Sequence, residues 1–387
     1  MNKTILGVIA GVLAVFLSGS VFANDSLENR VEALENNASK VKIEGQLQLD
    51  TGLWFDDTAS AGLDDRVTLR RVRLGASGDV GDGWGYKLEL DASDSVTAKD
   101  AVISKRIEIG DDFNVQALAG HHKAGTSIDE NTSSKNLTFM ERSIASNISG
   151  DNFGTRRLGG SAILNLPHTY IHTGIFGREL SGSSSQMSWN TRAMVTGLED
   201  RIGVGGTYAQ LLELDNSGTH TLRYRDRPET RVDGGYLIDT GDITAESANH
   251  YGISGFLTYG SLHGQGEYFV ENITVNSSTD RSFNGYYGQA GYILTGEQRT
   301  WNPQRATWNS INPSNDIGAI EVAYRYSYQD LNDATITGGI ETNHTGALNW
   351  YPRKNVKLGL NVIRGTFDDA NESKDFIFGG LRTQISF

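Results

Sequence analysis

Apolar and polar residues alternate one by one along most of this chain. In the stretch AIEVAYRYSYQD, apolar and aromatic residues take one face of an extended strand, and Glu321 and Arg325 take the other. VKIEGQLQLD (41–50) and WGYKLELD (84–91) repeat the contrast. A soluble sandwich would also alternate, but it would not need aromatic residues at the ends of its apolar face. The pattern predicts an all-β fold, a transmembrane antiparallel β-barrel with an apolar outside and a wet lumen.

The first residues have a different texture. MNKTILGVIAGVLAVFLSGSVFA has an early lysine, an apolar run and small residues before a cleavage point, so residues 1–23 are predicted to be a secretory signal peptide. An N-terminal membrane anchor is the alternative, but the apolar run is short for a membrane span. Residues 24–40 hold a helical seam of barely two heptads and are expected to form a short periplasmic leader. A loosely ordered leader fits that length equally well.

The last residues indicate the same barrel. In IFGGLRTQISF, the residues Ile377, Leu381 and Ile385 share a face with the terminal Phe387. A strand that ends on an aromatic carboxy-terminus is similar to the last strand of Gram-negative outer-membrane barrels. The alternative is a frayed end that happens to finish in phenylalanine.

Connections between the expected strands follow a two-sided rhythm. Tight turns such as GDVGDGW (78–84) alternate with long polar stretches such as residues 124–152 and 300–315. This rhythm predicts short periplasmic turns and long extracellular loops. Counting candidate strands gives one barrel of about sixteen strands over residues 41–387, wide enough for an aqueous channel.

The run LRYRDRPETR collects cations in a chain whose formal net charge is -13. Arg223, Arg225 and Arg227 recur every second residue, so on a strand they point to one face. Like charges on neighbouring rungs repel one another. The three arginines either form a path for anions or are ordinary wet lumen arginines balanced by Asp226 and Glu229. The chemistry of the residues supports both interpretations equally.

Other functional classes find little support in the sequence. It has no Ser-His-Asp order with a nucleophile elbow, no phosphate-cradling glycine loop before a helix, and no basic patch interleaved with aromatic residues. We therefore expect no enzyme, no cofactor, no metal site and no nucleic-acid partner. A structural or adhesive exported β-protein stays open as a less favoured alternative.

Six segments along the chain share their order with one known family. They are LRRVRLGASGDVGDGWGYKLELD, LTFMERS, LRYRDRPE, GYYGQAGYILTGEQR, AYRYSYQDLND and LNWYPRKNVKLGLNVIR. Together they resemble the phosphate-selective porins O and P, over nearly the whole mature chain. The resemblance implies a trimeric, sixteen-stranded porin of a Gram-negative outer membrane, with its third extracellular loop in the lumen. It implies that TFMERS narrows the pore and that Arg223, Arg225 and Arg227 form an arginine ladder.

This resemblance makes a water-filled, anion-selective channel the expected function. Phosphate or a similar oxyanion would cross by passive diffusion, and a general non-selective porin is the alternative. The expected partners are small anions, outer-membrane lipid and lipopolysaccharide, and copies of the same chain in a homotrimer.

Four further cations are candidates for the anion path. Arg71 and Arg73 share the phase of Leu69 and are expected to face the lumen. Arg70 is expected on the opposite face, unless it sits at the water-exposed end of the strand. Lys123 and Arg142 flank the presumed constriction loop and are expected to form a basic lip. An ion pair with Glu141 that anchors the loop is equally consistent with the sequence.

The entry to that loop departs from the family pattern. The chain has AGHHKAGTS where relatives carry an aromatic residue and a proline around the lysine. Lys123 is kept, but His122, Ala124 and Gly125 replace its usual neighbours. The sequence therefore predicts a looser loop entry, which weakens the expectation of a tight phosphate constriction.

Overall fold

The computed structural model describes residues 41–55, 64–110, 112–177, 180, 186–212, 220–232, 235–275, 280–333, 335–368 and 373–387. The predicted signal peptide (1–23) and leader (24–40) lie outside the described residues. The barrel belongs to one compact unit, Lys42–Phe387.

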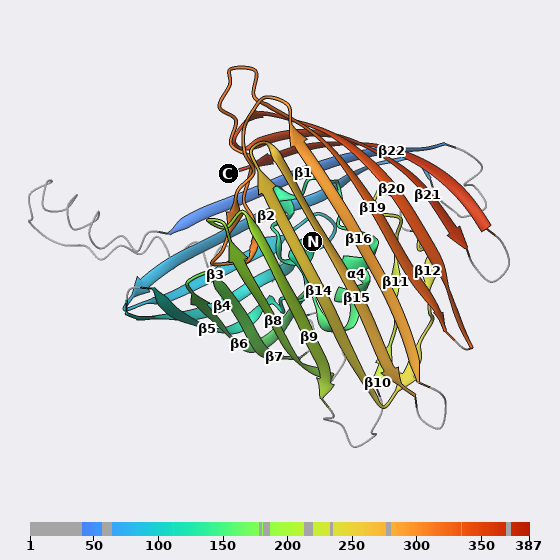
Figure 1. Cartoon of the computed structure of the whole chain (residues 1–387), viewed down its shortest axis with the longest axis horizontal. Helices are drawn as coiled ribbons and strands as arrows, with labels where there is room; N and C mark the ends of the chain where they lie inside the picture. Colours follow the sequence, from blue (N-terminus) through green and yellow to red (C-terminus); the bar gives the residue numbers. More distant parts are fainter. Residues whose placement is uncertain are drawn as a thin grey trace, which may run out of the picture. The chain divides into compact units, whose positions relative to one another are not determined.

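Among the described residues, sixteen antiparallel strands close into one barrel (Figure 1). The strands, in their order around the barrel, are β1 (Lys42–Phe55), β2 (Arg66–Gly81), β3 (Trp84–Asp91), β4 (Thr97–Ile109), β5 (Phe113–Lys123), β6 (Arg156–Leu166), β7 (Thr169–Phe176), β8 (Met187–Gly197), β9 (Ile202–Leu212), β14 (Ser247–Tyr259), β15 (Leu262–Thr274), β16 (Arg281–Ile293), β19 (Ala319–Asp333), β20 (Ile336–Arg353), β21 (Val356–Asp368) and β22 (Ser373–Ser386). The predicted fold class and strand number are confirmed.

The barrel closes where its first and last strands meet. β1 pairs with β22 from Gln46 opposite Ser386 onwards, and Gly45 and Phe387 exchange both backbone hydrogen bonds at 3.0 Å. The Phe387 ring covers Gly45 so closely that a Cβ there would lie 2.1 Å from a ring carbon. The aromatic end is therefore part of the seam, as the sequence predicted.

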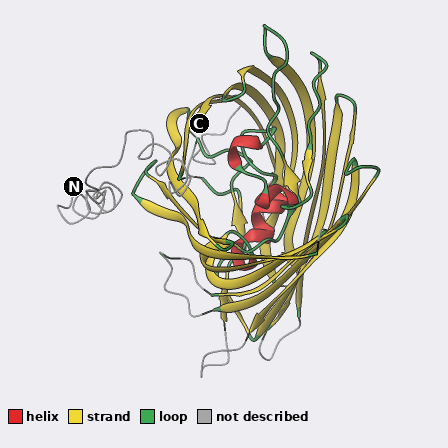
Figure 2. Ribbon diagram, turned by 90° about the vertical axis from the view of Figure 1, so that its left-hand side faces the viewer, coloured by secondary structure: helices red, strands yellow, loops and turns green. Residues whose placement is uncertain are grey.

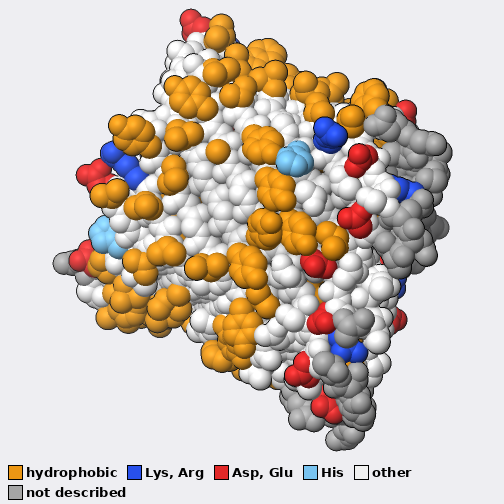
Figure 3. Space-filling view, turned by 45° about the vertical axis from the view of Figure 1, so that its right-hand side comes forward, with side chains coloured by type: hydrophobic (Ala, Val, Ile, Leu, Met, Phe, Trp, Pro, Cys, Tyr) orange, Lys and Arg blue, Asp and Glu red, His pale blue; other side chains and the backbone are white. Residues whose placement is uncertain are grey.

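The two faces of the strands differ as the alternation predicts. On β1, Gln48 and Asp50 are buried inside the barrel, whereas Leu47 and Leu49 are exposed on its outside. Hydrophobic side chains are spread over the visible outer face in Figure 3, with charged ones mostly towards its edges. No helix among the described residues is long and apolar enough to cross a membrane. The closed barrel carries its apolar surface outward, as a membrane barrel must.

The two ends of the barrel carry different connections, with one exception. Short turns such as residues 82–83, 167–168 and 354–355 lie at the end that holds both barrel termini. The exception is residues 294–318, which connect β16 to β19 at this same end and include β17 (Trp301–Asn302) and β18 (Thr307–Trp308). The prediction that residues 300–315 form a loop at the opposite end is wrong. The segment is mostly polar, but it contains Trp301 and Trp308, and the burial of these two side chains places it inside the barrel.

Three segments fold into the lumen, and the helices of the first lie inside the barrel in Figure 2. The first infolded segment, residues 124–155, connects β5 to β6 and contains α3 (Ile128–Asn131), the short 3₁₀ turn Ser134–Asn136 and α4 (Ile144–Phe153). The second, residues 220–232 and 235–245, follows β9 and forms β10 (His220–Leu222), β11 (Arg225–Asp226), β12 (Ile238–Asp239) and β13 (Ile243–Ala245). The third is residues 294–318.

Candidate functional site

The first infolded segment is anchored to the wall through Glu141 of the TFMERS stretch. Its buried carboxylate accepts paired hydrogen bonds from Arg70 at 2.7 and 2.9 Å, and further bonds from Arg71 at 3.1 Å and Arg382 at 2.9 Å. Burial opposes its ionisation, but the three guanidinium groups outweigh this and hold the pKa of Glu141 well below its usual range. The loop is therefore fixed by a buried carboxylate that stays charged.

Arg70 and Arg71 both face the lumen because of a β-bulge. In the β1–β2 pairing, Gln48 lies opposite Arg71 and the next residue, Leu49, lies opposite Leu69. Arg70 is the extra residue, so the strict period of two is broken at that point. Leu69 is exposed outside, and the expectation that Arg70 lies opposite the lumen arginines is wrong.

Lys123 and Arg142 contact the loop rather than free lumen space. The Lys123 ammonium donates to the carbonyls of Glu130 at 2.5 Å and Asn131 at 3.1 Å. Arg142 donates to the carbonyls of Asp129 and Thr132 and pairs with Glu130 at 3.1 Å. Both side chains hold the end of α3, where helix carbonyls lack intrahelical partners.

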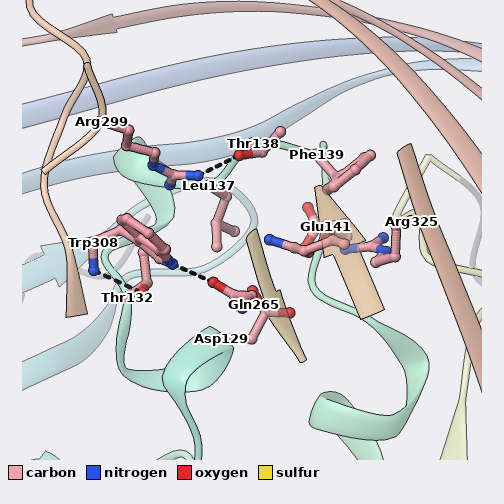
Figure 4. A pocket seen from close by; sticks show the side chains of 11 residues that line it. Asp129, Thr132, Leu137, Thr138, Phe139, Glu141, Gln265, Arg299, Trp308 and Arg325 are labelled. Carbon is pink, nitrogen blue, oxygen red and sulfur yellow. Dashed lines mark hydrogen bonds between the residues drawn. The ribbon is translucent and has the colours of Figure 1, made fainter. Parts of the chain in front are cut away.

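On one side of the lumen, side chains of the first and third infolded segments meet (Figure 4). Arg299 and Trp308 of the third segment lie against Thr138 and Thr132 of the first, and the Trp308 indole donates to Gln265 of β15. Asp129, Glu141 and Arg325 also line this space, which leaves no room for a water molecule.

The opposite side of the lumen keeps contact with solvent. The inward-facing Arg73, Lys87 and Arg156 are 14%, 35% and 17% exposed. Each of them pairs with carboxylates, and we call the group the paired wall, composed of Arg73, Lys87, Arg156, Glu89, Asp91 and Asp100. The closest pairs are Arg73 to Asp91 at 2.8 Å, Lys87 to Asp100 at 2.5 Å and Arg156 to Asp100 at 2.6 Å. The open wall is thus charged but nearly balanced.

The predicted ladder belongs to the second infolded segment and not to a barrel strand. Arg223 is exposed, and Arg225 and Arg227 are half-buried, while Tyr224 between them is fully buried. The guanidinium groups of Arg225 and Arg227 each lie 4.2 Å from the centre of the Tyr236 ring. We call Arg225, Arg227 and Tyr236 the arginine shelf. Stacking occupies the guanidinium faces and leaves their N–H edges for other partners.

The carboxylates within the motif turn away from the shelf. Asp226 accepts from Arg231 and from Asn147 of α4, both at 2.7 Å. Glu229 pairs with Arg325 of β19 at 2.5 Å. Within the described part of the chain, the guanidinium groups of Arg225 and Arg227 form no ion pair with a carboxylate, although Asp239 and Asp226 are near enough to interact with their charges. The acids expected to balance the ladder therefore balance other arginines.

The first rung differs from the shelf. Arg223 pairs with Asp239 at 2.6 Å and with Asp242 at 3.6 Å. The hydrogen bonds that Arg223 donates to Asp239 raise the pKa of Arg223. Burial opposes ionisation of Asp239, but these bonds outweigh it and lower the pKa of that carboxyl. Asp151 of α4 accepts from the Arg225 backbone N–H at 3.0 Å, and burial raises the pKa of Asp151 well above its usual range. Asp151 therefore adds less negative charge beside the shelf than an exposed aspartate would.

Sequence reasoning missed Tyr236 and the destinations of Asp226 and Glu229. Tyr236 stands nine residues beyond Arg227 and shares no motif with it. The bulge at Arg70 had one signal, because LRRVR doubles an arginine where a strict alternation would have an apolar residue.

Comparisons with known proteins agree with this architecture. Residues 41–387 match the family model "Phosphate-selective porin O and P". Porin O of Pseudomonas aeruginosa is 25% identical over 439 residues, covering 100% of this chain and 99% of that protein. An anion-selective porin from Comamonas acidovorans has the same fold at 13% identity (TM-score 0.59; 90% of this chain and 99% of that one). So does the trimer form of Vibrio cholerae OmpT at 12% identity (TM-score 0.58; 90% and 99%).

The match of the family model over the entire barrel identifies the group to which the protein belongs. The closed barrel with its infolded segments and the relative that matches over its full length lead to the same conclusion. The chain is a member of the phosphate-selective porin O and P family, a channel-forming protein of the Gram-negative outer membrane.

Proposed function

We propose that the protein is an anion-selective porin through which phosphate or similar oxyanions diffuse passively over the arginine shelf. The observation that carries the proposal is that Arg225 and Arg227 are half-buried, lie against Tyr236 and form no ion pair with a carboxylate of the described residues. Lys123 and Arg299, by contrast, donate to oxygens of the first infolded segment, and the cations of the paired wall bind carboxylates. The guanidinium groups of Arg225 and Arg227 therefore contribute positive charge that no direct ion pair among the described residues neutralises.

The physical demand on such a pore is to replace lost hydration. An anion that enters a narrow lumen sheds part of its water shell, and fixed cations must offset this loss of several kcal/mol. Arginine suits the task because its planar N–H edge binds oxyanions through paired hydrogen bonds and stays charged at any working pH. Two adjacent rungs let the ion change partners stepwise, so neither rung holds it for long.

The other predicted cations support this path from different places. Arg73 belongs to the paired wall, where it sets a nearly neutral background. Arg71, Lys123 and Arg142 hold the first infolded segment and thereby set the width of the lumen. We assign them to the structure of the constriction and Arg225 and Arg227 to contact with the anion.

We further propose that the protein assembles as a homotrimer in contact with outer-membrane lipid and lipopolysaccharide. The trimer form of the Vibrio cholerae protein and the apolar outer face support this assembly. Size measurement in mild detergent tests it, and a mass consistent only with monomer would argue against it.

A general diffusion porin is the second candidate, and the paired wall favours it. Cations and carboxylates of similar number along the open side would pass small ions of either sign. Single-channel recording in planar bilayers, first in chloride and then with added phosphate, separates the two. The proposed function predicts anion preference and a chloride current that phosphate reduces. A current with no preference and no phosphate effect would support the general porin.

A further inference from the structure

Glu229 lies two residues beyond Arg227, where the second infolded segment turns against the barrel wall. Its backbone adopts the left-handed conformation, with φ of 55°, and its N–H donates to the carbonyl of Arg227 at 2.7 Å. A residue with a Cβ rarely takes this conformation unless its surroundings enforce it. The contacts of the side chain show what enforces it here.

The buried Glu229 carboxylate joins three elements of the molecule. Its donors are the backbone N–H of Ile144 at the start of α4 (3.1 Å), the Arg325 guanidinium of β19 (2.5 and 3.1 Å), the Ser327 hydroxyl of β19 and the Thr345 hydroxyl of β20 (2.9 Å). All of its oxygen acceptor positions are directed at protein groups, and the side chain is 0% exposed. The carboxylate therefore has no capacity left for the shelf arginines.

Arg325 extends this junction to the constriction loop. Its Nη1 donates to the carbonyl of Glu141 at 3.0 Å, and its guanidinium lies 4.4 Å from the centre of the Phe139 ring. The same arginine thus binds Glu229 on one side and the first infolded segment on the other. One buried pair, Glu229 with Arg325, therefore contacts both the segment of the shelf and the constriction loop.

We propose that Glu229 is a positioning residue for anion selectivity: it holds Arg225 and Arg227 where the anion passes, without touching the anion. This inference rests on the proposed function. The short distance along the chain from Glu229 to Arg227 and the left-handed turn between the wall and the shelf transmit any shift of the carboxylate to both guanidinium groups.

Charge and position predict opposite effects at this residue, which makes the inference testable. Glu229→Gln removes a negative charge from the lumen, so charge alone would increase anion preference. A positioning role predicts a decrease, because Arg325 loses its partner and the turn loses its anchor. Glu229→Asp keeps the charge but withdraws the carboxylate from the wall. Charge alone predicts no change for this variant, whereas positioning again predicts a decrease.

The experiment measures zero-current potentials across a salt gradient and the phosphate concentration that halves the chloride current. We expect the half-blocking concentration to rise about three- to tenfold in both Glu229 variants, since a displaced guanidinium loses part of a charge-assisted contact. Glu297→Gln is the matched control, a carboxylate of the third segment that contacts Thr295, Ser314 and Asn315. It should leave both quantities unchanged.

A second route avoids loss of folding. The double variant Ser327→Ala, Thr345→Val removes two donors to the carboxylate and keeps the Arg325 pair, so the barrel should still assemble. Heat-modifiable migration on gels checks assembly for every variant. The double variant should show the same direction of change as Glu229→Asp, with a smaller size.

Arg225→Gln, Arg227→Gln is measured in parallel to separate the two proposals. If this variant loses anion preference while the Glu229 variants and the Ser327→Ala, Thr345→Val variant keep it, the positioning role is overturned and the proposed function stands. If neither set changes the preference, the proposed function fails and the positioning role fails with it. A gain of anion preference in Glu229→Gln, with none lost in Glu229→Asp, would also overturn the positioning role.

Discussion

The paired wall and the arginine shelf contain the same kind of side chain in opposite electrostatic states. On the wall, Arg73 and Arg156 face carboxylates at 2.8 and 2.6 Å. On the shelf, Arg225 and Arg227 share one tyrosine ring instead. The difference arises from the destinations of the neighbouring acids, because Asp226 and Glu229 bind Arg231 and Arg325. A count of lumen arginines therefore says less about selectivity than the partners that each arginine has.

The largest effect is expected where pairing is most complete. Glu141→Gln leaves Arg70, Arg71 and Arg382 crowded without their shared carboxylate, and loss of one partner of a buried pair costs about 3–5 kcal/mol. Denaturant unfolding in lipid vesicles should show this loss of folding free energy. Glu108→Gln removes an exposed carboxylate paired with Arg106 and should change stability by less than about 0.5 kcal/mol.

The same variant has a defined pH signature. The pKa of Glu141 is lower in the folded protein than in the unfolded chain, so its contribution to stability is present above the unfolded pKa. That contribution falls as pH decreases through the folded pKa. Unfolding from neutral pH to the acid range should show this loss in the natural protein and not in Glu141→Gln. Equal acid sensitivity of both proteins would contradict the anchor.

The second effect separates charge from geometry on the shelf. Arg225→Lys, Arg227→Lys keeps both charges but removes the planar N–H edge, so phosphate binding should weaken about tenfold while anion preference in chloride is kept. Arg223→Lys is the matched control, because Asp239 already occupies that guanidinium. Unchanged block by phosphate in the double variant would show that charge alone attracts the anion.

A third change should make the wall resemble the shelf. Glu89 lies 3.3–3.5 Å from Lys87, Arg73 and Arg156, so Glu89→Gln leaves net positive charge on the open side. Anion preference should increase by about 1 kcal/mol or less, since solvent and salt screen this half-buried site. Zero-current potentials measure the change. A shift towards cations would contradict the placement of this wall along the open lumen.

The smallest effect concerns the first rung. Asp239→Asn should free Arg223 and increase anion preference slightly. The effect is small because the pair is partly exposed and solvent screens its charges. The lowered pKa of Asp239 predicts that acidification frees Arg223 only below the usual aspartate range. Conductance recorded between neutral and mildly acidic pH should therefore show no contribution from this pair.

The barrel could be predicted from the sequence because each strand carries its own signal. Alternation assigns a face to Gln48 or Leu49 without knowledge of any other strand. The closing strand was predictable for the same reason, since Phe387 ends an alternating run. The orientation of Arg70 was not predictable, because a bulge depends on the partner strand. The third infolded segment was not predictable either, because the burial of Trp301 and Trp308 depends on residues distant in the sequence.

The sequence predicted which arginines belong to the candidate site, but not which of them form ion pairs. LRYRDRPETR shows alternate arginines, and they occupy alternate positions in the structure. The same run places Asp226 and Glu229 next to these arginines, which suggests that the acids neutralise the arginine charges. The partners of these acids come from residues up to 116 positions away, at Thr345, and no local pattern encodes that contact.

The central claim is that Arg225 and Arg227 are the cations that select anions, because they are half-buried, lie against Tyr236 and form no ion pair with a carboxylate of the described residues. The most direct test is the zero-current potential of Arg225→Gln, Arg227→Gln in a potassium chloride gradient, compared with the natural protein. The account predicts an anion-selective potential for the natural protein and its loss, or a cation-selective potential, for the variant. An undiminished anion preference in a correctly assembled variant would contradict the account and leave a general porin.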